Sequence, residues 1–95
     1  MSRTPQLTKE MAELLAAVVA ALDLPIPSVD VADERAHDRL LELRATDVRI
    51  VLDTLIRFSS SPGSVARNAA EIRRRTDREP VDYAPFVSRV EEGTS

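Results

Sequence analysis

The residues best suited to chemistry in this chain are four polar side chains within one long helical stretch: Asp33, His37, Arg44 and Asp47. Placed at about 100° per residue, all four project into an arc that is otherwise apolar, where charged groups need partners. Asp33 and His37 lie one turn apart, as do Arg44 and Asp47, so each pair can form a charge-assisted hydrogen bond within the helix. The functional interpretation is a polar pocket or a pH-sensitive seam around His37. The preferred one is a polar layer that fixes packing register, under the first helix or across a dimer interface.

The sequence contains no set of residues typical of an enzyme active site. There is no Gly-rich phosphate loop, no Ser/His/Asp set, and no cluster with metal-ligand spacing. Asp33 and His37 supply only two of the ligands that a metal needs, and the chain has no cysteine to add a thiolate. The sequence therefore predicts a protein that is not an enzyme, with no metal, no cofactor and no small-molecule substrate.

A second candidate site lies between residues 55 and 75. The run from Ser61 to Arg67 resembles the turn and opening of a helix-turn-helix recognition helix. In that family the second helix enters the major groove, and its early polar residues meet bases and phosphates. Carried over by position, the resemblance implies DNA contacts from Ser61, Gly63, Ser64, Arg67, Asn68, Arg73, Arg74 and Arg75, while Val65 packs inward.

This chain departs from that family at several positions. Leu55 stands where the first helix usually has a small Ala, Ser59 where the turn usually has Gly, and Ser60 where an apolar residue is expected. Asn68 falls where the recognition helix usually buries an apolar side chain. The alternative is a short surface helix whose C-terminal arginines complement the helix dipole. DNA binding through residues 61–75 is thus kept as the second hypothesis.

The helix expected at residues 8–23 precedes both candidate sites. Thr8 can cap it, and Pro25 and Pro27 end it because neither has an N–H to donate and each disfavours helical geometry before it. Its apolar stripe, at steps of three and four residues, consists of Leu7, Met11, Leu14, Leu15, Val18, Val19 and Leu22.

The long helix expected at residues 30–58 has an apolar arc too wide for a surface helix. This apolar arc is covered either by the other helices of a small bundle or by a second copy of the chain. Five residues form the expected self-interface: Leu41, Arg44, Val48, Val51 and Leu55. Whether the helix kinks at Ala45–Asp47 is left open, since Thr46 or Asp47 could cap a new helix.

Two shorter helices are expected after the break at residues 59–63. One covers residues 62–75, with a thin buried stripe of Val65, Ala69 and Ile72. The other covers residues 83–91, holds Tyr83 and Phe86, and has Pro85 in its first turn, where proline is tolerated. An alternative places Val81 to Val87 in an extended wing, although two prolines disfavour a long strand.

Length and charge limit the remaining possibilities. The 95 residues suit one all-α domain, a bundle of three to four helices around the long central helix. The net charge of −3 argues against a general polyanion binder. The apolar run from Leu14 to Leu22 is too short to span a membrane, and the acidic residues before it do not suit a signal peptide. A cytoplasmic location is the default expectation.

Several short segments carry a wider resemblance. They are Ala21-Leu22-Asp23-Leu24-Pro25, Asp38-Arg39-Leu40-Leu41, Arg44 and the apolar segment Val48 to Leu55. Together they make the chain similar to small actinobacterial proteins of unknown function, which implies only an accessory role, linked to mobile elements. From the residues we expect action through protein–protein contacts, with a homodimer or another protein as partner.

Overall fold

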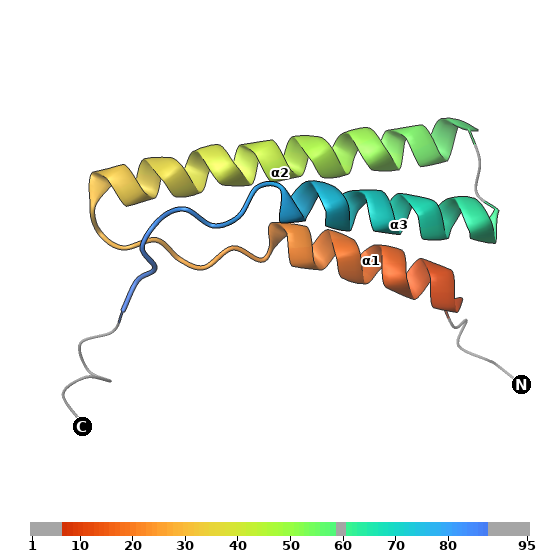
Figure 1. Ribbon diagram of the computed structural model, residues 1–95, viewed down its shortest axis with the longest axis horizontal. Coiled ribbons are helices and arrows are strands. Elements are labelled where there is room, and N and C mark those ends of the chain that lie inside the picture. The colour runs from red at the N-terminus through yellow and green to blue at the C-terminus, as the bar shows by residue number, and fades with distance from the viewer. Residues whose placement is uncertain (1–6, 59–60, 88–95) are drawn as a thin grey trace, which may run out of the picture.

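A computed structural model describes residues 7–58 and 61–87 of the chain. This part contains three α-helices: α1 (Lys9–Leu22), α2 (Val31–Phe58) and α3 (Pro62–Asp77). Figure 1 shows that α2 runs antiparallel to both α1 and α3. The prediction of an all-helical bundle is confirmed, and the three predicted helices begin and end close to their expected bounds.

Short-range side-chain contacts define where the helices begin. The Thr8 hydroxyl accepts a hydrogen bond from the Met11 N–H at 3.1 Å, and Asp30 Oδ1 accepts one from the Ala32 N–H at 2.8 Å. Ser61 caps α3 by accepting from the Ser64 N–H at 3.3 Å, with Pro62 at the first helical position. These contacts satisfy N–H groups that have no partner within their own helix. The question of a kink is also answered, because α2 continues through residues 45–47 without a break.

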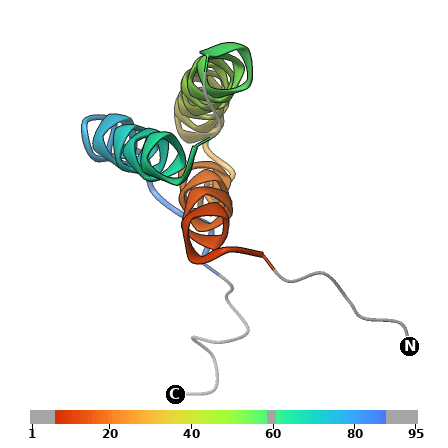
Figure 2. The same cartoon turned by 90° about the vertical axis from the view of Figure 1, so that its right-hand side faces the viewer.

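The core lies where the three helices meet. Its buried apolar side chains are Leu14, Ala17 and Ala21 of α1, Val48, Val51 and Leu55 of α2, and Val65, Ala69 and Ile72 of α3. The alanines let α1 and α3 approach closely, and this pair makes the most extensive contact in the bundle. The long helix is therefore not the axis of packing. It lies along one side of the α1–α3 pair, as the end-on view in Figure 2 shows.

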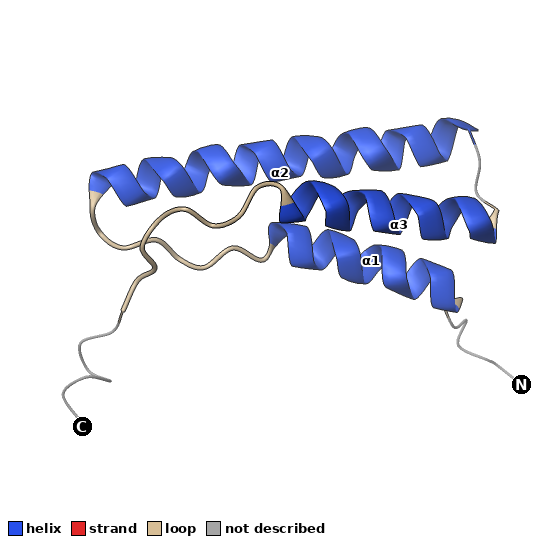
Figure 3. Cartoon of the chain, viewed as in Figure 1, coloured by secondary structure: helices blue, strands red, loops and turns tan. Residues whose placement is uncertain are grey.

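The helix expected at residues 83–91 is not formed over its described part, residues 83–87. Residues 88–91 lie outside the described residues. The chain from 78 to 87, here called the C-terminal strap, contains no helix and runs beside the connector that joins α1 to α2 (Figure 3). Ser28 N donates to Ala84 O at 2.9 Å and Phe86 N donates to Ile26 O at 2.7 Å, around an isolated antiparallel bridge between Pro27 and Pro85.

The physical reason for this difference is a competition for backbone hydrogen bonds. Pro85 cannot donate one and disfavours helical geometry at Ala84, whereas the proline-rich connector offers the Ile26 carbonyl as an acceptor and the Ser28 N–H as a donor. The Tyr83 hydroxyl adds a 2.6 Å hydrogen bond to Pro25 O. The extended alternative agrees with the absence of a helix from 81 to 87, but a single bridge is not the strand pairing of a wing.

Candidate functional site

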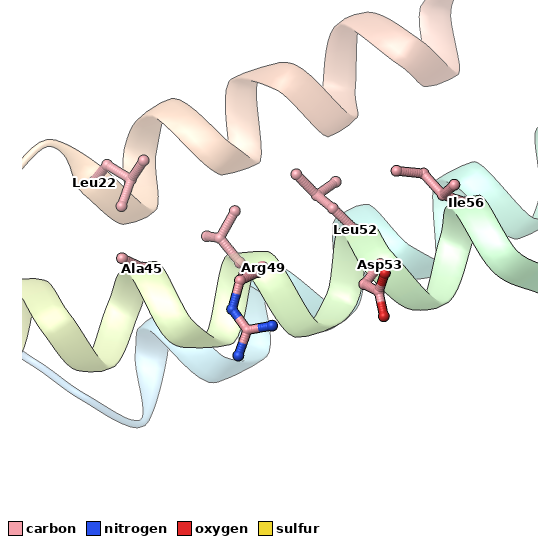
Figure 4. A pocket seen from close by; sticks show the side chains of 7 residues that line it. Leu22, Ala45, Arg49, Leu52, Asp53 and Ile56 are labelled. Atoms are coloured by element: carbon pink, nitrogen blue, oxygen red, sulfur yellow. The ribbon is translucent and has the colours of Figure 1, made fainter.

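An apolar groove lies between α1 and α2, on the side that α3 leaves open. Its volume is about 400 Å³, and no residue of α3 lines it. The lining residues are Leu22 of α1 and Ala45, Val48, Arg49, Leu52, Asp53 and Ile56 of α2 (Figure 4). Leu22, Leu52 and Ile56 lie along the gap between the two helices, whereas Arg49 and Asp53 point away from α1.

The α2 side of the groove has the spacing of a coiled-coil seam. Leu41, Ala45, Val48 and Leu52 follow one another at steps of four, three and four residues, and Ile56 continues the strip after four more. Steps of this kind keep side chains on one face, where they can interlock with a neighbouring helix. Ile56 is 81% exposed, so its side chain packs against almost nothing within this chain. Val48 is buried and Leu52 is half-buried, so the α2 strip is open to solvent at Leu41, Ala45 and Ile56.

The α1 side repeats the same spacing. Met11, Leu15, Val18 and Leu22 follow one another at steps of four, three and four residues. Leu15 is 45% exposed, and Val19 at the outer flank of the strip is 65% exposed. Of this α1 strip only Leu22 lines the groove, while Met11 and Val18 pack against the core.

The predicted self-interface needs correction. Val48, Val51 and Leu55 belong to the core of the single chain, and Arg44 is only 6% exposed. Of the five predicted residues only Leu41 remains partly open to solvent. Helix α2 does carry apolar surface that the chain itself leaves uncovered, but this surface lies beside the predicted face, at Ala45, Leu52 and Ile56. Sequence reasoning missed Ile56, since the position of α3 decides which flank stays open.

The four polar residues of α2 also find partners other than those predicted. Asp33 accepts hydrogen bonds from Ser28 Oγ at 2.6 Å and from Ala84 N at 3.2 Å, so it binds the connector and the strap rather than His37. His37 Nδ1 lies 3.0 Å from Asp38 Oδ1, and its ring meets the Tyr83 ring edge-on at 5.6 Å. The predicted Asp33–His37 pair is therefore not formed.

Arg44 joins three segments of the chain from a buried position. Its Nη1 donates to Ala21 O at 3.0 Å, near the C-terminal end of α1, and its Nη2 donates to Glu79 O in the strap at 2.6 Å. A helix C-terminus has carbonyls without partners and a negative dipole end, so a guanidinium is well suited there. Arg44 thus does not pair with Asp47 as predicted, but ties α1 and the strap to α2.

Asp47 belongs instead to a small polar cluster with α3 and the strap. Asp47 Oδ1 accepts from Arg75 Nη1 at 3.0 Å, and Arg75 Nε donates to Glu71 Oε2 at 2.8 Å. Burial and the neighbouring Asp47 raise the pKa of Glu79, while Arg44 and Arg78 oppose the shift. Glu79 was not predicted from the sequence because only the strap brings it beside Asp47. Over the ranges that the structure describes, no group of three or more His, Asp or Glu side chains is placed to hold a metal ion.

The residues assigned to DNA by the helix-turn-helix resemblance are mostly engaged within the chain. Ser64 is buried, and Asn68 Nδ2 donates to Ser64 O at 2.7 Å. Arg74 pairs with Glu71, and Arg75 pairs with both Glu71 and Asp47. Ser61, Gly63, Arg67 and Arg73 are exposed.

The arrangement of α2 and α3 also differs from that motif. Its two helices cross at roughly 90–120°, whereas α2 and α3 lie antiparallel and side by side (Figures 1 and 2). The early residues of α3 are therefore not presented as the start of a recognition helix.

Comparisons with known proteins identify neither a family nor a function for this chain. Within the described ranges, none of the helices combines the length and the apolar character that crossing a membrane requires. The similarity to small actinobacterial proteins stays a prediction. No protein-family model, no curated protein and no solved structure matches this chain.

Proposed function

We propose that this chain acts through protein–protein contacts, without catalysis of its own, and that it associates with a second copy of itself through the α1–α2 groove. The observation that carries the proposal is the apolar strip of α2 with coiled-coil spacing, which lines an open groove bordered by Leu22 of α1. Helices with such strips are stable in water when another helical surface covers them.

The exposed area is consistent with an interface. Large apolar side chains at and beside the groove remain in contact with water, since Leu22 is 39%, Leu41 37% and Ile56 81% exposed, and exposed apolar patches mark interaction sites. Two α1–α2 pairs facing each other would complete a four-helix core, in which each groove receives helices of the other copy.

The experiment that tests this proposal is a light-scattering measurement of molar mass across a dilution series. The wild-type chain should be dimeric at high concentration. Ile56→Asp and Leu22→Asp place a charge on opposite walls of the groove, so each should weaken the dimer by more than about a hundredfold in Kd. Both positions are exposed, so the helical content seen by circular dichroism should not change.

Ile50→Asp is the matched control. Ile50 is on the same helix and 41% exposed, but it is not among the residues that line the groove. This variant should remain dimeric. A wild-type chain that stays monomeric at all concentrations would contradict the proposal, as would a dimer that survives both groove variants.

A role in DNA binding is not proposed, because no contact in the structure favours it over an internal role for the same residues. Arg75 is half-buried between two carboxylates, and Asn68 bonds the backbone of its own helix. Only Arg67 and Arg73 extend from α3 as exposed arginines that are not part of the described ion pairs of this helix. Two cations form a small footprint for phosphate recognition.

A further inference from the structure

The charges beside the groove indicate how the two copies would be oriented. We propose that the dimer is two-fold symmetric, with α2 antiparallel to the partner copy's α2, and that Arg49 of each copy pairs with Asp53 of the other. This inference rests on the proposed self-association and specifies the register and specificity of the same groove.

The charges themselves favour the antiparallel orientation. Among the described residues that line the groove, the charged ones are Arg49 and Asp53, which have opposite signs and both point away from α1 (Figure 4). In an antiparallel pairing centred near residue 51, Arg49 lies opposite Asp53 and Asp53 lies opposite Arg49, which makes two reciprocal ion pairs. A parallel pairing places Arg49 beside Arg49 and Asp53 beside Asp53, and both contacts are repulsive.

The apolar residues lead to the same register independently. The α2 lining runs from Ala45 to Ile56, and its midpoint falls between residues 50 and 51. An antiparallel pairing about that point brings the large, protruding Ile56 of one copy against the small Ala45 of the other. Large against small is the arrangement that lets facing helices interlock at close distance. The charge pairing thus places the centre of the antiparallel contact at residue 51, and the pairing of large with small side chains places it between residues 50 and 51. The two centres differ by less than one residue.

The intramolecular surroundings of these charges are compatible with pairing between copies. Asp53 Oδ2 accepts a hydrogen bond from Arg57 Nε at 2.9 Å, and both side chains are more than half exposed. An exposed pair of this kind within one helix contributes little to stability. The second carboxylate oxygen of Asp53 can accept from a further guanidinium, because a carboxylate has about four acceptor positions.

The test is a charge-reversal series measured by light scattering and sedimentation at low salt. Arg49→Asp and Asp53→Arg each turn both reciprocal pairs into like-charge contacts, so each variant alone should dimerise about tenfold or more weakly than wild type. An equimolar mixture of the two variants should regain tight association as a heterodimer, because every cross-pair is then attractive. The double variant Arg49→Asp/Asp53→Arg should form a homodimer of nearly wild-type affinity.

Ionic strength and a control variant distinguish the ion pairs between copies from other effects of the substitutions on dimerisation. Differences between the variants should shrink as ionic strength rises, since exposed charge pairs are screened. Arg57→Ala removes the ion pair within the helix without altering the groove residues, and it should leave the Kd unchanged. A mixture no tighter than the single variants, or a double variant that is not restored, overturns the antiparallel register if the wild type is dimeric. A monomeric wild type instead refutes the proposed function itself.

Discussion

Replacement of Arg44 by methionine should be among the most destabilising single changes in this chain. Methionine keeps much of the length of the side chain and removes the guanidinium. Two hydrogen bonds from a charged donor are lost, at 3.0 Å to Ala21 O and 2.6 Å to Glu79 O. Bonds of this type contribute about 1.5–3 kcal/mol each, and the two carbonyls are left without that donor. The gross loss is therefore about 3–6 kcal/mol.

Part of this loss is offset because a buried guanidinium is itself costly to remove from water. Arg44 Nε is buried without a hydrogen-bond partner among the described residues, which increases that cost. We therefore expect the free energy of unfolding to fall by about 2–4 kcal/mol in Arg44→Met. For a domain of this size the midpoint of thermal unfolding should drop by roughly 10–20 °C.

The assay is urea denaturation followed by circular dichroism, with Arg39→Met as the matched control. Arg39 is an exposed arginine on the same helix, so its replacement should change the free energy of unfolding by no more than about 0.5 kcal/mol. An Arg44→Met variant as stable as wild type would refute the reasoning. It would mean that α1 and the strap stay attached to α2 without this side chain.

Two further predictions concern the polar cluster and the core. Because burial and Asp47 raise the pKa of Glu79 in the folded chain, its contribution to stability is present below the ordinary pKa of 4.5 and is lost as pH rises through the higher folded value. Glu79→Gln should therefore have a higher free energy of unfolding than wild type at pH 7, and this advantage should shrink toward pH 4. Urea titrations at both pH values measure it. An equal difference in free energy of unfolding at the two pH values would contradict the raised pKa of Glu79. Ile72→Ala should lower the free energy of unfolding by about 2–5 kcal/mol, because Ile72 is the most completely buried large side chain and its loss leaves a cavity between the helices. A loss below about 1 kcal/mol in the same titration would show that the helices close over the gap.

Most of the helical structure could be predicted from the sequence because its signals are local. Thr8, Asp30 and Ser61 cap helices through contacts within a few residues, and Pro25 and Pro27 end the first helix by their own covalent geometry. The buried stripe of α3 follows from spacing along the chain, whereas the stripe predicted for the first helix was wrong. There Leu14, Ala17 and Ala21 are buried, and four residues of the predicted stripe are exposed: Leu7, Leu15, Val19 and Leu22. The exception was the segment from 83 to 87, where local cues allow a helix but the connector supplies better partners for the backbone.

The candidate site was less predictable because it depends on which surfaces remain uncovered. The sequence indicated that the long helix has more apolar surface than short neighbours can bury, and Leu41 remains partly open. It could not show that Val48 and Leu55 would be covered while Ile56 would not. That outcome depends on how α3 packs against α1, which is a contact between segments about fifty residues apart.

The sequence by itself determined the type and bounds of the three helices, since caps, prolines and apolar spacing act over a few residues. Only the tertiary structure decided the partners of the charged side chains and the location of the open groove. Arg44 and Asp47 are within reach of each other on one helix, yet each bonds to other segments instead. A buried charge is stabilised by whichever partners packing brings nearest, and packing joins residues that are distant in sequence.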